Sequence, residues 1–282
     1  SLIVGNFLGG EALAAVSSSG SLIFLLTGFV NGVSLGAGVL IARHFGAKDR
    51  EALSRTVHTT VALGLAAGAA LTLIGVALTP QILRWMGTPD DVIGNSIIYF
   101  RIYFLGSIPV VLYNVGASIL QSVGDSRSPM CYLIAASLLN VVLDLLFIGG
   151  FHMGVGSAAL ATILSQALSA ALAFRKLSRS KEAYGVRWRQ IRFHGPTLRA
   201  VVVQGVPSGI QNSVISLANV IVQANINSFG AQAMAGCGAY SKVEGFAFLP
   251  VTCFAMALAT FVSQNIGAGQ LLSLIHISEP TR

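Results

Sequence analysis

The sequence predicts an all-α, polytopic membrane protein with a two-lobed transporter fold. First, only 10% of its 282 residues are charged while 54% are hydrophobic, and the mean hydropathy is +0.76. A soluble domain carries about 25% charged residues. Second, apolar runs alternate with short polar breaks, and every second break is basic. Third, a stretch near the start of the chain recurs near its end.

Seven apolar runs are long enough to cross a bilayer, which takes about 20 residues in a helix. The breaks between them, such as GTPDD (87–91) and GDSRSP (124–129), carry the Gly, Pro and Asp that end helices. Pro109 lies inside the third run and is predicted to kink it. The predicted spans are 16–42, 56–80, 93–121, 130–150, 156–174, 201–228 and 234–263.

The Lys and Arg residues predict the orientation of these spans. They gather in loops 43–55, 124–129 and 175–199, whereas the intervening loops hold only Arg84 or no basic residue. Basic loops remain in the cytoplasm as a rule. We therefore expect a multi-pass protein of the inner (plasma) membrane, with the three basic loops in the cytoplasm.

Composition and motifs also exclude several classes of function. The net charge of +7 resides in loops between apolar runs, so it forms no patch for nucleic acid. The sequence contains no HExxH or P-loop motif, so neither an enzyme nor a cofactor is expected, and an ion gradient must supply the energy. The three cysteines lie in apolar surroundings without metal-ligand spacing, and we expect small core residues.

An internal repeat appears when the sequence is shifted by 221 residues. NFLGGEALAA (6–15) then falls on NSFGAQAMAG (227–236), and VLIARHFGAKD (39–49) falls on TFVSQNIGAGQ (260–270). The shift contains an even number of spans, so the two copies keep the same orientation, as in transporters built from two similar halves. An intact protein of this kind would have about 440 residues, twice the shift.

The repeat predicts the domain organisation. We expect an N-lobe with its first helix truncated to the outer end, a basic cytoplasmic linker, the start of a C-lobe, and a tail that we interpret as a sequencing-adapter artefact. The chain thus holds most of the first six-helix bundle and the first two helices of the second. The predicted boundaries are 1–174, 175–199, 200–271 and 272–282.

Four stretches resemble the multidrug and toxic compound extrusion (MATE) family: VGNFLGGEALAAV, GVLIARHFGAKD, LNVVLDLLFIGGFHMGVGSAALAT and FVSQNIGAG. The resemblance covers essentially residues 1–270. It implies a twelve-helix antiporter that exports organic cations or other xenobiotics in exchange for H⁺ or Na⁺. The family also has an acid on the first helix, which would fall immediately before Ser1.

Asp144 is the leading candidate for ion coupling. It lies in the apolar run LLNVVLDLLFIGG (138–150), where a charge costs several kcal/mol unless it is compensated. Asn140 lies one turn earlier on the same helical face, and Ser137 extends the stripe. Carboxylate, amide and hydroxyl oxygens suit Na⁺, and a buried carboxylate alone suits H⁺. The structural alternative is an aspartate that only caps a helix end.

Other polar residues within the spans are candidates for a substrate cavity. In the second half, Lys242 and Glu244 could face the cavity, or Lys242 could extend to the membrane surface. Asn114 and Gln121 share a helical face and could line a cavity or bond helix to helix. Gly32, Gly36 and Gly38 indicate close helix packing. The cavity candidates are Tyr113, Asn114, Gln121, Gln211, Asn212, Gln223, Lys242 and Glu244.

Together these features predict a monomeric, cation-coupled efflux antiporter that works by alternating access. Its partners would be the lipid bilayer and a small cationic or amphipathic substrate, with no nucleic acid. The alternative is a flippase for lipid-linked saccharides, which would favour a cavity lined by several Arg and Lys for pyrophosphate. Only Arg101 and Lys242 lie within the predicted spans. A receptor or scaffold would leave the polar intramembrane residues unexplained.

Overall fold

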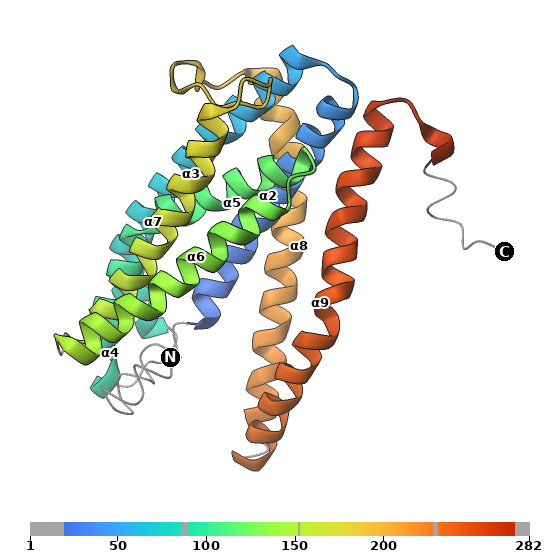
Figure 1. Cartoon of the computed structure of the whole chain (residues 1–282). Coiled ribbons are helices and arrows are strands. Elements are labelled where there is room, and N and C mark those ends of the chain that lie inside the picture. Colours follow the sequence, from blue (N-terminus) through green and yellow to red (C-terminus); the bar gives the residue numbers. More distant parts are fainter. Residues whose placement is uncertain (1–19, 86–89, 152, 228–230, 274–282) are drawn as a thin grey trace.

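The computed structural model describes residues 20–85, 90–151, 153–227 and 231–273, and some side chains within these ranges lie outside the description. The described chain is helical throughout its main elements. A bundle formed by α2 to α7, here called the first lobe, stands beside a pair formed by α8 and α9, the second lobe (Figure 1). The predicted all-α, two-lobed fold is confirmed.

The helices vary widely in length. α4 and α5 are separated at Gly106, and α6 changes to a π-helical turn after Asp144. Two short elements, η1 and η2, lie between the longer helices. The bounds are α2 Gly20–Gly46, α3 Arg50–Trp85, α4 Asp90–Leu105, α5 Ser107–Ser122, α6 Arg127–Asp144, η1 Leu145–Gly150, α7 Gly156–Arg179, η2 Trp188–Gln190, α8 Gly195–Asn227 and α9 Ala231–Gly267.

Helices lie at all seven predicted spans. Within the described residues, four segments are long and apolar enough to cross a membrane, and the bent pair α4–α5 would be a fifth. α2 and α8 lie at the other two predicted spans, and the fully described parts of these two helices do not meet the same test of length and composition. The prediction of cysteines in the core is wrong, since Cys131 and Cys253 are exposed and Cys237 is half-buried.

The third predicted span, 93–121, is two helices rather than one kinked helix. α4 ends at Leu105 and α5 begins at Ser107, with a bend of 47° between them. A Cβ atom on Gly106 would lie 2.2 Å from the Ile163 side chain, so the chain turns where only glycine fits. Pro109 then lies in the first turn of α5, where its missing N–H costs little.

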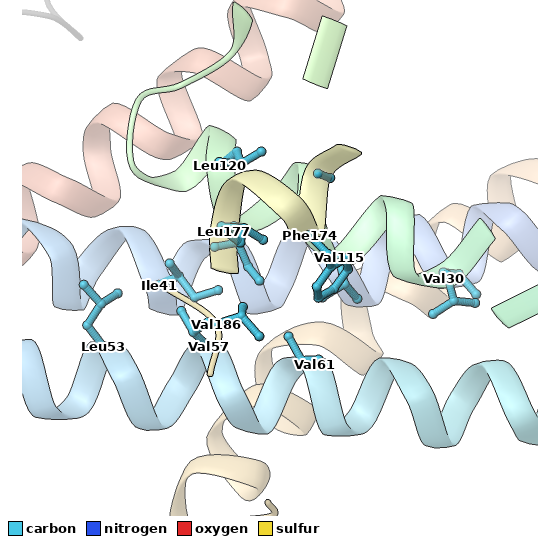
Figure 2. Close-up of a cluster of buried hydrophobic side chains, with 13 residues drawn as sticks. Val30, Ile41, Leu53, Val57, Val61, Val115, Leu120, Phe174, Leu177 and Val186 are labelled. Atoms are coloured by element: carbon cyan, nitrogen blue, oxygen red, sulfur yellow. The ribbon is translucent and has the colours of Figure 1, made fainter. Parts of the chain in front are cut away.

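The main hydrophobic core of the first lobe joins four helices and a loop. Side chains from α2, α3, α5 and α7 meet there, among them Ile41, Val57, Leu120 and Leu177, each fully buried (Figure 2). Val186, from the segment between α7 and α8, completes the cluster and is 2% exposed. The core therefore holds part of the predicted linker as well as the helices.

Glycines let the two lobes approach each other closely along α2 and α8. A Cβ atom on Gly32 would lie 2.5 Å from the backbone of Gly209, and one on Gly36 would lie 2.4 Å from that of Gly205. Small residues at four-residue spacing bring two helix backbones together in this way. The prediction that Gly32 and Gly36 are close-packing positions is confirmed.

The internal repeat is visible in how α2 and α9 end. The two helices end at Gly46 and Gly267, which are 221 residues apart. Two positions later, Lys48 and Gly269 both have left-handed backbones, with φ of 56° and 71°. Equivalent hydrogen bonds close both turns, from Ala47 N–H to Arg43 O (3.0 Å) and from Ala268 N–H to Gln264 O (2.9 Å). Equivalent sequence thus forms the same helix end in both lobes.

The segment between the lobes lies against the first lobe instead of hanging free. α7 continues to Arg179 and α8 begins at Gly195, so residues 180–194 are the part of the predicted linker 175–199 that lies outside the two long helices. The Arg187 N–H donates to Nε2 of the buried His58 (3.0 Å), and His58 Nδ1 lies 2.7 Å from the Ser54 carbonyl. Further along, Thr59 Oγ1 lies 3.5 Å from His194 Nδ1. α3 therefore holds the linker at two points.

A second contact at the same end of the first lobe predicts a pH dependence. Asp125 accepts hydrogen bonds from the Lys176 ammonium and from the Ser128 N–H (3.1 Å). Burial alone would raise the pKa of the Asp125 carboxyl, but these hydrogen bonds outweigh it and hold the pKa below its usual value. The contact therefore stabilises the fold above the unfolded pKa of about 3.9 and loses its effect as the pH falls through the folded pKa.

We expect Asp125→Asn to lower the free energy of unfolding by up to about 1 kcal/mol at neutral pH, because the contact is partly exposed. The difference from the parent protein should close below about pH 3.9. Thermal unfolding in detergent at several pH values measures both. A difference that persisted unchanged in acid would show that the carboxylate charge is not the cause.

Candidate cation site and inter-lobe cavity

Asp144 occupies the last position of α6, where the backbone changes from an α-helix to the π-helical turn η1. The wider turn is closed by a hydrogen bond from Phe151 N–H to Leu146 O (3.0 Å). The next residue, Leu145, is 48% exposed, whereas Asp144 is 8% exposed. The change of helix type thus lies where a single acidic side chain is turned into the protein.

The Asp144 carboxylate has an unsatisfied oxygen. Its Oδ1 is buried without a hydrogen-bond partner, a property shared within the described residues only by Ser96 Oγ. Nearly all buried polar atoms in proteins are hydrogen-bonded, because leaving one unpaired costs about 1–3 kcal/mol. A proton or a cation would satisfy this oxygen directly.

Asn140, one turn before Asp144, links α6 to α7. Its amide Nδ2 donates to Thr162 Oγ1 (3.4 Å), and the Thr162 hydroxyl donates in turn to the Ala158 carbonyl (2.9 Å). Because the Asn140 amide nitrogen is used, its carbonyl oxygen is available as an acceptor or ligand. The arrangement can therefore supply carboxylate, amide and hydroxyl oxygens, the hard ligands that Na⁺ favours.

Aromatic and apolar side chains close off the same end of the bundle. Tyr99 on α4 is near enough to interact electrostatically with Asp144. It packs with Ile148 of η1 and with Val155 and Ala159 at the start of α7. This surrounding of low polarity strengthens any charge interaction at Asp144.

The sequence identified Asp144 and Asn140 but not their neighbours Thr162 and Tyr99. A lone threonine or tyrosine in an apolar helix gives no signal by itself, because its partner lies on another helix. Ser137, predicted on the same stripe, is exposed and has no hydrogen bond to the described residues. The bond to Asn140 thus connects Thr162, and not Ser137, to this site.

The candidates on α5 divide into two groups. The buried Tyr113 donates its hydroxyl to the Pro129 carbonyl (3.0 Å), and Asn114 bonds back to the Val110 carbonyl of its own helix (2.9 Å). The Tyr113 bond joins α5 to α6, whereas the Asn114 bond stays within α5. Gln121, in contrast, lines a cavity.

This inter-lobe cavity has a volume of about 500 Å³ and lies between α2 and α5 on one side and α9 on the other. Hydroxyl and amide groups line part of it, including Ser118, Gln121 and Thr260, and apolar side chains such as Met256 and Phe261 line the rest. None of the described residues that line it is charged. Its size and mixed lining suit a small amphipathic molecule.

The candidates of the second lobe do not form one cluster in the described part of the chain. Gln211 is exposed, while Asn212 and Glu244 are half-buried. The side chains of Gln223 and Lys242 lie outside the description, as do the residues around Ser1, where the family resemblance places a further acid. The geometry therefore supports the first-lobe site alone.

Comparison with known proteins gives a consistent family. A model of the MatE family matches residues 1–146 and 207–277. The chain is 33% identical over 277 residues to the probable multidrug resistance protein YoeA of Bacillus subtilis, covering 95% of this chain and 60% of that protein. It is 27% identical over 270 residues to an FAD transporter of Shewanella oneidensis, covering 93% and 59%.

A solved structure of a MATE protein in a bent conformation superposes with a TM-score of 0.90 at 25% identity. The match covers 98% of this chain and 62% of that one. The chain thus spans about 60% of the length of these relatives. The family match covers both lobes, and the fold agrees throughout the aligned region. The chain belongs to the MatE family, the multidrug and toxic compound extrusion transporters.

Proposed function

We propose that the protein containing this chain is a cation-coupled efflux transporter that exports organic cations or other amphipathic xenobiotics. The observation that carries the proposal is the buried Asp144 carboxylate with an unpaired oxygen, one turn from the Asn140–Thr162 contact. Its relatives named as multidrug resistance proteins support the direction of transport and the type of cargo.

The mechanism follows from the charge of that carboxylate. Na⁺ or H⁺ enters from the side opposite the basic loops and neutralises Asp144, whose burial makes the charged form costly. Neutralising Asp144 changes the charge and the hydrogen bonds that α6, η1 and α7 must accommodate. The stability of one lobe arrangement relative to the other therefore changes. The lobes then rock about the inter-lobe cavity and carry the substrate across.

The cavity supports an amphipathic cargo more than a lipid-linked saccharide. A pyrophosphate group needs several Arg or Lys side chains, and the lining of the inter-lobe cavity contains none. The relative named as an FAD transporter makes a flavin nucleotide a second cargo to test beside a cationic dye.

The decisive experiment is transport in reconstituted vesicles, with Na⁺ and pH gradients imposed separately. We expect one of the two gradients to drive efflux of a cationic dye, and an excess of FAD not to compete. Dye movement independent of both gradients would contradict ion coupling. Efflux of FAD but not of the dye would contradict the proposed cargo.

Thr162→Val provides a finer test of the site. Valine keeps the shape of threonine but removes the oxygen that accepts from Asn140, so we expect a loss of about 1 kcal/mol in ion binding. That loss corresponds to an approximately fivefold higher ion concentration for half-maximal transport. Thr60→Val is a matched control, because the buried Thr60 hydroxyl bonds only within its own helix (2.8 Å). An equal effect in both variants would show that Thr162 acts through general stability.

A further inference from the structure

An apolar groove of about 400 Å³ lies between α5 and α7, apart from the cation site and the inter-lobe cavity. Small and apolar residues form most of it, including Pro109 and Leu112 on α5 and Ala167 and Ala171 on α7. A groove with this lining is well suited to a hydrocarbon chain, which needs apolar contact but no hydrogen bonds.

One end of the groove has a different character. Arg175, Ser178 and Trp188 line it there, next to the linker and the basic loops. Both Arg175 and Trp188 are exposed, and Trp188 has 58% of its surface accessible. Within the described residues Arg175 forms no ion pair, whereas its neighbour Lys176 pairs with Asp125. A cationic side chain and an amphipathic aromatic ring at one end of an apolar groove match the two parts of a phospholipid.

Trp188 is held in this position although it is exposed. Its ring packs on Phe174 of α7, with centroids 5.7 Å apart. The preceding residue, Arg187, donates its N–H to His58 (3.0 Å), and Val186 is buried in the core. The backbone is thus fixed immediately before Trp188. Tryptophan at this level of a membrane protein sits at the boundary between headgroups and acyl chains.

Charge in the adjoining linker favours one class of lipid. From residue 183 to residue 199 the chain contains Arg187, Arg189, Arg192 and Arg199 but no Asp or Glu. Arg175 offers a planar guanidinium that can bind two phosphate oxygens. Anionic lipids are concentrated in the cytoplasmic leaflet, which is where the basic loops are expected.

We propose that the groove between α5 and α7 is a binding site for an anionic phospholipid of the cytoplasmic leaflet. Its acyl chain lies along Leu112, Ala167 and Ala171. Its phosphate binds Arg175, beside the Trp188 ring. Because Trp188 belongs to the linker between the lobes, the bound lipid contacts the segment that joins the two moving parts.

Quenching of Trp188 fluorescence tests the proposal in the reconstituted protein. Vesicles contain either phosphatidylglycerol or phosphatidylcholine brominated in the upper part of the acyl chains. Trp85→Phe removes the other tryptophan of this chain, and the difference between Trp85→Phe and Trp85→Phe/Trp188→Phe isolates the signal of Trp188. We expect phosphatidylglycerol to quench at a lower mole fraction than phosphatidylcholine.

Variants then assign the selectivity to residues. Arg175→Gln should reduce the preference for phosphatidylglycerol about fivefold, the effect of one basic group at a membrane surface. Arg84→Gln, which removes the same charge in a loop that the predicted topology places at the opposite membrane surface, should leave it unchanged. Ala171→Phe, which fills the groove, should weaken quenching by phosphatidylglycerol. Equal quenching by both lipids, an absence of quenching, or full selectivity in Arg175→Gln would overturn the proposal.

Discussion

We expect Asp144→Asn to lower ion-driven efflux at least about tenfold, which corresponds to about 1.4 kcal/mol. Asparagine has nearly the shape of aspartate but cannot exchange a proton or balance a cation, so ion entry no longer changes the charge in the bundle. Initial rates of dye efflux from vesicles, under the gradient that drives the parent protein, measure the loss.

The same substitution should not weaken the fold. It removes a buried charge whose Oδ1 has no partner, so the melting temperature should stay equal or rise. Asp125→Asn is the matched control for the transport measurement. It makes the same chemical change at a carboxylate that lies in a loop and is paired with Lys176. Efflux that remains ion-dependent in Asp144→Asn would refute the coupling role. A variant that loses transport only because it unfolds would reveal itself by a lower melting temperature.

The second large effect is expected at the crossing of α2 and α9. A Cβ atom on Gly46 would lie 1.9 Å from the Gln264 carbonyl oxygen, and one on Gly267 would lie 1.9 Å from the Arg43 carbonyl oxygen. Real Cβ atoms do not approach within 3.0 Å. Gly46→Ala must therefore separate the two helix ends, which destabilises the contact between α2 and α9 by about 1–3 kcal/mol. The Gln264 hydrogen bond to the Ser122 carbonyl (2.7 Å) should break with it.

Spin labels at Lys48 and Gln270, both exposed beside the crossing, measure the separation. We expect a longer label distance in Gly46→Ala than in the parent protein. Gly267→Ala should have the same effect, and the double variant should cost less than the two single costs added together, because both glycines form one contact. Gly94→Ala is the control, since no atom lies within 4 Å of its Cβ position. An unchanged distance in Gly46→Ala would show that the crossing does not hold the lobes.

Much of this fold can be predicted from local features of the sequence. Hydropathy locates the helices because each span must satisfy its own backbone in lipid. The 221-residue repeat correctly matches the ends of α2 and α9, at Gly46 and Gly267. The break at Gly106 escaped prediction because its close packing partner, the Ile163 side chain, is distant in sequence.

The candidate site was predictable only in part, for the same reason. An acidic residue in an apolar run can be recognised from the sequence alone, so Asp144 and its neighbour Asn140 could be proposed. Thr162 acquires a role only when α7 packs on α6. The cysteines were misjudged because an apolar residue in a membrane span can face lipid as readily as the core, and nothing in its neighbours along the chain distinguishes the two.

The docking of the linker has a mechanical consequence. His58 and Thr59 on α3 contact Arg187 and His194 of the linker. The linker therefore has little freedom to move where α8 begins. In the proposed rocking motion, the start of α8 would be the pivot about which the second lobe turns. α8 has 33 residues, which makes it about 50 Å long, so a tilt of only about 10° moves its far end by about 9 Å. A small rotation at the basic end is thus amplified at the opposite membrane surface.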